Sequence, residues 1–207
     1  KSSINKLMNT AGQRIDTAND IIVAPWNDAE SLEAILDAHD DIAAVLMEPY
    51  MCDEGPILPK EGYLQAVKDM CEKHGVLLIF DEVITGFRLS LGGAQQYFGV
   101  TPDLAIFGKA IAGGFSLSMI CGRRELMEKV HPSGTFNATP IAVAASLATI
   151  AELEKPGTYE RMDTLGKKLT AGLMELGKKH GIKVYANHHN AICQLQLGIE
   201  RAPEDFR

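Results

Sequence analysis

The chain has 207 residues, of which 46% are hydrophobic and 23% are charged, so it can bury a sizeable core in one or two domains. Its formal charge of −7 and its pI near 5.4, without any basic run, argue against nucleic acid or an anionic membrane as a partner. No apolar stretch approaches the roughly 18 residues of a membrane span, and no signal-peptide pattern stands at the start. We therefore expect a soluble, cytoplasmic protein that acts on small molecules.

Strands and helices are predicted to alternate along the first half of the chain. Apolar runs bounded by polar or turn residues favour buried strands, whereas apolar residues at helical spacing favour amphipathic helices. Such alternation is typical of an α/β fold with a parallel sheet built from right-handed crossovers. In chain order we expect a strand at 20–24, a helix at 28–37, a strand at 42–47, a helix at 60–74, and strands at 76–80 and 104–108.

The strand predicted at Phe115–Cys121 changes this topology. It follows the strand at 104–108 by only a few residues, and so short a connection cannot form a parallel crossover. We therefore expect it to run antiparallel to its predecessor. Gly113 and Gly114 lie between the two strands and would allow the tight return.

A break at residues 155–157, with the sequence Lys-Pro-Gly, separates two predicted helices. We place a domain boundary there, with residues 1–154 in a large domain and residues 155–207 forming the start of a smaller α+β domain. The predicted elements on either side of the break are helices at 140–152 and 157–180 and strands at 184–185 and 191–197.

Two charged residues, Asp81 and Lys109, close apolar runs that are predicted to be core strands. Ligands of parallel sheets collect at the carboxyl ends of the strands, which is where both residues are expected. A buried lysine can attack an aldehyde because burial lowers its pKa, and a buried aspartate needs a cationic partner. Pyridoxal phosphate meets both needs, since its aldehyde bonds to lysine and its ring nitrogen pairs with a carboxylate. Taken alone, the two residues could equally form a structural ion pair.

Longer motifs around these residues resemble the core of the class III pyridoxal-phosphate-dependent aminotransferases. The segment that follows the first motif leans toward the glutamate-1-semialdehyde 2,1-aminomutase-like branch of that family. The resemblance implies the fold type I of pyridoxal-phosphate-dependent transferases, with a mostly parallel sheet and one antiparallel strand. It runs from about Asn19 to Ala151. The segments that carry it are Asp81–Arg88, Gly92–Val100, Thr101–Leu104 and Gly108–Gly114.

The resemblance also implies roles for five residues. Lys109 would hold the cofactor as a Schiff base and act as acid–base catalyst, while Asp81 would pair with the ring nitrogen. Val83 would lie against one face of the ring, and Glu48 would stand on its substrate side. Thr135 would reach across a homodimer interface to the cofactor phosphate of the other subunit, since a helix N-terminus suits a phosphate.

Simpler interpretations of three of these residues stay open. Thr135 could belong to an ordinary helix-capping turn, Glu48 could be a strand-terminal charge in solvent, and Val83 could be a core residue. No histidine or cysteine spacing indicates a metal site, and the four cysteines show no disulfide pattern. We therefore expect reduced thiols and no metal.

Two features suggest a fragment or the ordered part of a longer protein. Proteins of the family are roughly twice this length, and their phosphate-cradling turn lies before the region that matches Lys1. Between Val130 and Gly134 the chain has fewer residues than the family pattern, so Val130 and His131 could be neighbours in numbering only.

Three functional hypotheses follow. The first is a pyridoxal-phosphate-dependent aminotransferase that moves an amino group between an amino compound and a keto acid or aldehyde. The second is intramolecular amino transfer of the aminomutase type, and the third is a non-catalytic α/β binding module. The joint presence of Asp81, Lys109 and Thr135 favours an enzyme, although we expect this chain by itself to be inactive.

Overall fold

The computed structural model describes residues 20–52, 57–131 and 133–202. Its centre is a four-stranded sheet in the order β1-β2-β3-β4. Strands β1 to β3 are parallel, and β4 runs antiparallel to β3, which confirms the mixed sheet predicted from the sequence. The strands are β1 (Ala44–Met47), β2 (Leu77–Asp81), β3 (Leu104–Phe107) and β4 (Met119–Gly122).

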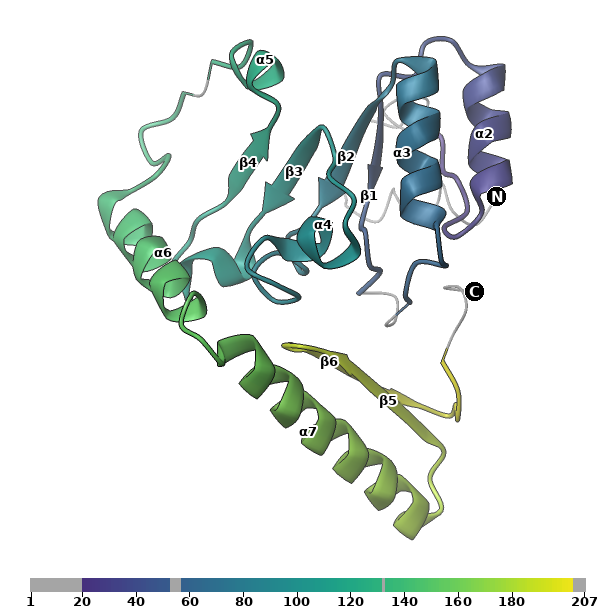
Figure 1. The fold of residues 1–207 in the computed structure, drawn as a ribbon, viewed down its shortest axis with the longest axis vertical. Helices are drawn as coiled ribbons and strands as arrows, with labels where there is room; N and C mark the ends of the chain where they lie inside the picture. The colour runs from purple at the N-terminus through teal and green to yellow at the C-terminus, as the bar shows by residue number, and fades with distance from the viewer. Residues whose placement is uncertain (1–19, 53–56, 132, 203–207) are drawn as a thin grey trace, which may run out of the picture.

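Two helices, α2 (Ala29–Ala38) and α3 (Tyr63–His74), lie side by side at the β1 side of the sheet (Figure 1). The first begins where Asp28 accepts a hydrogen bond from the N–H of Ser31 at 3.0 Å, a typical N-cap. Apolar side chains of both helices pack with those of β2 into the main hydrophobic core. Its members from these three elements are Leu32, Leu36, Tyr63, Leu64, Val67, Met70, Cys71, Leu78 and Phe80.

Three short helices follow strands β2, β3 and β4. They are the helix α4 (Gly93–Phe98) between β2 and β3, the 3₁₀ helix η2 (Lys109–Ala112) after β3, and α5 (Arg124–Met127) after β4. The longer helix α6 (Pro140–Leu153) packs against η2 at the outer side of the sheet.

Helix α7 (Thr158–His180) packs against the hairpin of β5 (Val184–His189) and β6 (Ile192–Leu197). Two glycines of α7 let the hairpin approach closely. A β-carbon on Gly177 would lie 2.9 Å from Cβ of Val184, and one on Gly166 would lie 2.9 Å from Cδ2 of His188. Figure 1 shows the hairpin between α7 and the edge of the sheet at which the parallel strands end.

Three predictions about the elements were wrong in detail. Residues 21–25 form no regular structure, because no described strand lies beside them to share backbone hydrogen bonds, and Ile21 and Ile22 are exposed. The strand expected at Phe115–Cys121 begins only at Met119. The strand expected at 184–185 continues to His189, since a tight turn at Asn190 and Ala191 lets the strand run longer than expected.

Candidate functional site

The carboxyl ends of the three parallel strands bring three of the predicted site residues to one edge of the sheet. Asp81 closes β2 and pairs in register with Ile106 of β3, three residues before Lys109. Glu48 directly follows β1, whose last residue pairs with Phe80. The prediction that Asp81 and Lys109 stand at neighbouring strand ends is therefore confirmed.

Asp81 is half-buried and fixed by its own loop. Its Oδ1 accepts a hydrogen bond of 3.0 Å from the N–H of Val83. This bond turns the chain after β2 and brings Val83 over the end of β3, where a β-carbon on Gly108 would lie 3.5 Å from Cγ1 of Val83. The apolar side chain of Val83 therefore lies beside Gly108, the residue that precedes the lysine.

Lys109 begins the 3₁₀ helix η2 with a φ of 45°, in the left-handed region that non-glycine residues rarely adopt. Such strain, on the order of 1–3 kcal/mol, is typically found at functional sites. The side chain is exposed, so the expectation of a buried lysine was wrong for this chain. The reason is local: the strand ends at Phe107, Gly108 is extended, and the turn at Lys109 carries its side chain past the edge of the sheet.

The return after the lysine follows the sequence prediction. Gly113 and Gly114 have φ values of 55° and 111°, and the N–H of Gly113 bonds to the carbonyl of Ala110. These conformations suit glycine and lead the chain back toward β4.

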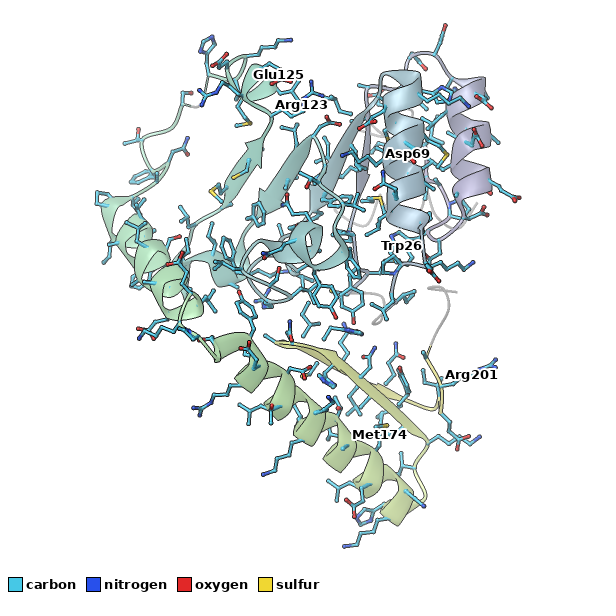
Figure 2. The ribbon with its side chains drawn as sticks, in the orientation of Figure 1. Trp26, Asp69, Arg123, Glu125, Met174 and Arg201 are labelled. Carbon is cyan, nitrogen blue, oxygen red and sulfur yellow. The ribbon has the colours of Figure 1, made fainter. Side chains whose placement is uncertain are left out.

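Glu48 is half-buried, and both its carboxylate and its backbone carbonyl accept hydrogen bonds. Its Oε2 accepts a hydrogen bond from the N–H of Cys52 at 3.1 Å, and its carbonyl accepts one from Nε1 of Trp26 at 3.1 Å. Figure 2 shows Trp26 near the end of α3 that faces the hairpin. The carboxylate is therefore held by its loop rather than extended into solvent.

Thr135 is not brought to this edge by a contact within the described part of the chain. It is exposed and lies in a turn, and α6 begins five residues later at Pro140, with Thr139 as its N-cap. The helix begins at the expected residue, and the turn at 135–138 lies between Thr135 and its first residue.

Sequence reasoning missed the role of Glu82. This carboxylate is fully buried and accepts hydrogen bonds from Oγ1 of Thr85 at 2.8 Å, the N–H of Ala94 at 2.6 Å and the N–H of Gln95 at 3.0 Å. It caps the first turn of α4 and so fixes the loop that follows Asp81. The sequence feature that could have pointed to this role is the pair Gly92-Gly93. Glycine is needed at position 93 because a β-carbon there would lie 2.3 Å from Oε2 of Glu82.

The docking of the hairpin onto the site loops was also missed. Tyr159 Oη donates to the carbonyl of Phe87 at 3.0 Å, and Asn190 Nδ2 donates to the carbonyl of Leu89. On the β1 side, Gln194 Nε2 donates to the carbonyl of Cys52. Residues of α7 and the hairpin thus hold both loops that leave the site edge.

Burial around this docking surface affects two titratable groups. The Tyr50 ring is fully buried and packs edge-on against the ring of His189, with ring centroids 5.3 Å apart. Burial raises the pKa of the Tyr50 hydroxyl and lowers the pKa of His189. Both groups are therefore held neutral near pH 7.

The residues at the edge fit the cofactor expected from the sequence. A carboxylate suits a protonated ring nitrogen, an accessible amine suits an aldehyde, and the surface formed by Val83 and Gly108 suits a flat ring. Two clefts, of about 760 and 660 Å³, lie elsewhere, and neither is lined by Asp81 or Lys109. No group of three or more histidine, cysteine or acidic side chains is arranged for a metal ion among the residues that the structure describes.

A family model, aminotransferase class-III, matches residues 5–186. The chain belongs to the class III aminotransferase family. It is 46% identical over 173 residues to glutamate-1-semialdehyde 2,1-aminomutase 2 of Brevibacillus brevis, a match that covers 80% of this chain and 40% of the relative. The chain thus spans about two-fifths of that relative's length.

Solved structures give the same result for the fold. An omega-transaminase from Sphaerobacter thermophilus has a TM-score of 0.88 and 32% identity, with 96% of this chain and 47% of that chain covered. A glutamate-1-semialdehyde-aminomutase from Pseudomonas aeruginosa in complex with PMP has a TM-score of 0.79 and 27% identity, with 95% and 47% covered. The fold is therefore that of the fold type I pyridoxal-phosphate-dependent transferases. None of the helices in the described ranges is long and apolar enough to span a membrane.

Proposed function

We propose that the full-length protein is a pyridoxal-phosphate-dependent enzyme that moves an amino group between an amino compound and a keto acid or aldehyde. The observation that carries this proposal is the placement of Asp81 and Lys109 at the ends of adjacent parallel strands, with Val83 packed over Gly108 between them. Family membership supports it, because the matched range, residues 5–186, includes both Asp81 and Lys109.

Four residues of this chain would each have a separate role in the reaction. When bound, pyridoxal phosphate supplies an aldehyde that bonds to amines and a ring that withdraws electrons from the substrate carbon. Lys109 would hold the cofactor through Nζ and, once released by the substrate amine, move a proton at the substrate carbon. Asp81 would keep the ring nitrogen protonated, Val83 would support one face of the ring, and Glu48 would line the substrate side.

Covalent labelling tests this assignment. Borohydride reduction of the full-length holoenzyme, followed by peptide mapping, is expected to place the pyridoxyl group on Lys109. This lysine alone has the strand-end position and the Gly-Lys-x-x-x-Gly-Gly context. Label on a different lysine would contradict the mechanism.

Intramolecular amino transfer is the second candidate. It is favoured by the 46% identity to a glutamate-1-semialdehyde 2,1-aminomutase. Both reactions begin with the same exchange of an amine at Lys109 and differ in whether the intermediate leaves the site. Turnover of glutamate 1-semialdehyde, compared with L-alanine and benzylamine each supplied with an α-keto acid, separates the two.

We further propose a homodimer in which Thr135 serves the neighbouring subunit's site. Large apolar side chains are exposed just after Thr135, on α6 and on β4: Phe136 is 85% exposed, Ile141 and Leu147 of α6 are 62% and 65% exposed, and Ile120 of β4 is 59% exposed. Helix α6 lies at the outer side of the molecule in Figure 1. Exposed apolar surface of this kind marks an interface, and a second copy of the chain would cover it.

Two further assignments accompany this proposal. The four cysteines are free thiols, two of them buried, which suits a reducing compartment such as the cytoplasm.

The proposed domain boundary between residues 154 and 155 falls at the break between α6 and α7, where Gly157 has a φ of 84°.

A further inference from the structure

The backbone of Cys52 joins a site residue to the hairpin. Its N–H donates to Oε2 of Glu48 at 3.1 Å, and its carbonyl accepts a hydrogen bond from Nε2 of Gln194 on β6. Cys52 is 2% exposed, so both bonds are shielded from water. A chain of hydrogen bonds therefore runs from the hairpin to the carboxylate at the end of β1.

The other polar atom of the Gln194 amide is buried without a hydrogen bond in the described part of the chain. Oε1 of Gln194 is buried and accepts no hydrogen bond from any residue that the structure describes. The assignment of its amide is settled by the partner, because a carbonyl can only accept and therefore faces the NH₂ group. Burial of an unpaired amide oxygen is destabilising, and this offsets part of the stability that the hydrogen bond to Cys52 provides.

Gln194 lies on the face of the hairpin that meets the large domain. His189, on the same face of the neighbouring strand, packs against Tyr50, two residues beyond Glu48. His188, one residue earlier, points the other way and meets Asp163 of α7 at 3.1 Å. The loop from Glu48 to Cys52 is thus packed directly against the face that carries Gln194.

We propose that Gln194 is a positioning residue for Glu48. By holding the carbonyl of Cys52, it fixes the loop so that the N–H of Cys52 directs the Glu48 carboxylate toward the substrate side of the site. This inference rests on the proposed function, which places Glu48 there. Gln194 itself touches no reacting group.

Hydrogen exchange tests the hydrogen-bond chain without any substrate. In the full-length protein, Gln194→Met removes both the donor and the unpaired oxygen and keeps the length of the side chain. We expect the amide of Cys52 to exchange about fivefold faster, as suits the loss of one hydrogen bond. Gln196→Met is the matched control, because Gln196 also has a buried, unpaired Oε1 but no hydrogen bond to Cys52. Equal exchange in the two variants would overturn the inference.

A double-mutant cycle tests the link to the site. With whichever of the three test substrates turns over fastest, Gln194→Met is expected to lower kcat/KM about fivefold, chiefly through KM. In a Glu48→Gln background the same change should cost less than about twofold, because the group it positions has already been altered. Equal losses in both backgrounds, or a loss that follows a fall in Tm, would show a merely structural role.

The outcomes separate this inference from the proposed function. A full-length protein without the visible absorbance of bound cofactor contradicts the proposed function and, with it, the role of Glu48. A protein that binds the cofactor and turns over, but in which Gln194→Met behaves as Gln196→Met does, contradicts only the role of Gln194.

Discussion

Asp81 and Lys109 stand at neighbouring strand ends, but the structure holds them differently. The carboxylate of Asp81 is fixed by the N–H of Val83, whereas the side chain of Lys109 is exposed on a residue with a positive φ. The fixed group suits a role that persists throughout the reaction. The accessible amine suits a group that forms and releases a covalent bond.

Asp81→Asn is expected to leave cofactor binding at Lys109 largely intact and to slow proton removal from the substrate. The neutral amide can still accept from the N–H of Val83, but it provides no charge to stabilise a protonated ring nitrogen. An opposite charge within about 4–6 Å shifts a pKa by about 1–3 units, so we expect turnover to fall by roughly tenfold or more. Absorbance of the bound cofactor and single-turnover kinetics of the full-length enzyme measure the two effects separately. Unchanged turnover would remove Asp81 from the site.

At the scale of elements, helix α4 shows how the loop after Asp81 is anchored. This six-residue helix has Gly92 as its N-cap, which offers no side chain to the first backbone N–H groups. Glu82 supplies the missing acceptor from the end of β2, in a position that is also favoured by the partial positive charge of the helix N-terminus. Strand β2 and α4 are therefore joined through one buried carboxylate.

Glu82→Gln is expected to lower the free energy of unfolding of the full-length protein by about 1–3 kcal/mol. The substitution keeps the shape but replaces one acceptor oxygen by an NH₂ group beside the backbone donors of Ala94 and Gln95, and it removes the charge from hydrogen bonds to a fully buried group. Urea unfolding, with Gln96→Glu on the exposed side of α4 as a comparison, measures the change. A stability equal to that of the unmodified protein would show that the Glu82 charge is not needed.

Elements with a local signal were predictable from the sequence, and those that depend on distant partners were not. The apolar runs before Asp81 and Lys109 form strands where expected, because burial on both faces requires continuous apolar sequence. Ile21 and Ile22 are also apolar and β-branched, but no strand in the described part of the chain pairs with them. The bonds from Glu82 to Ala94 and from Gln194 to Cys52 join residues at least 12 positions apart, and no local pattern records such contacts.

At the scale of the whole molecule, the contacts within the described part of one chain do not bring Thr135 to the site that it is proposed to serve. It is exposed in the turn before α6, beside the apolar side chains that we propose a second copy covers. Lys109, at the sheet edge, is exposed as well. The exposure of Thr135 is accounted for if this residue serves the site of the neighbouring subunit, as the homodimer proposal requires.

In the full-length protein, Thr135→Ala is expected to weaken cofactor retention by roughly 1–3 kcal/mol, the contribution of one charge-assisted hydrogen bond. Mixing Thr135→Ala subunits with Lys109→Ala subunits decides which subunit each residue serves. If Thr135 acts across the interface, a mixed dimer has one site with both lesions and one site with neither, so about half of the unmodified dimer's activity should return. If both residues serve the same subunit's site, every site in the mixed dimer carries one lesion. Different tags on the two subunits allow mixed dimers to be purified away from dimers of identical subunits. An absence of recovered activity in verified mixed dimers would contradict the cross-subunit role of Thr135.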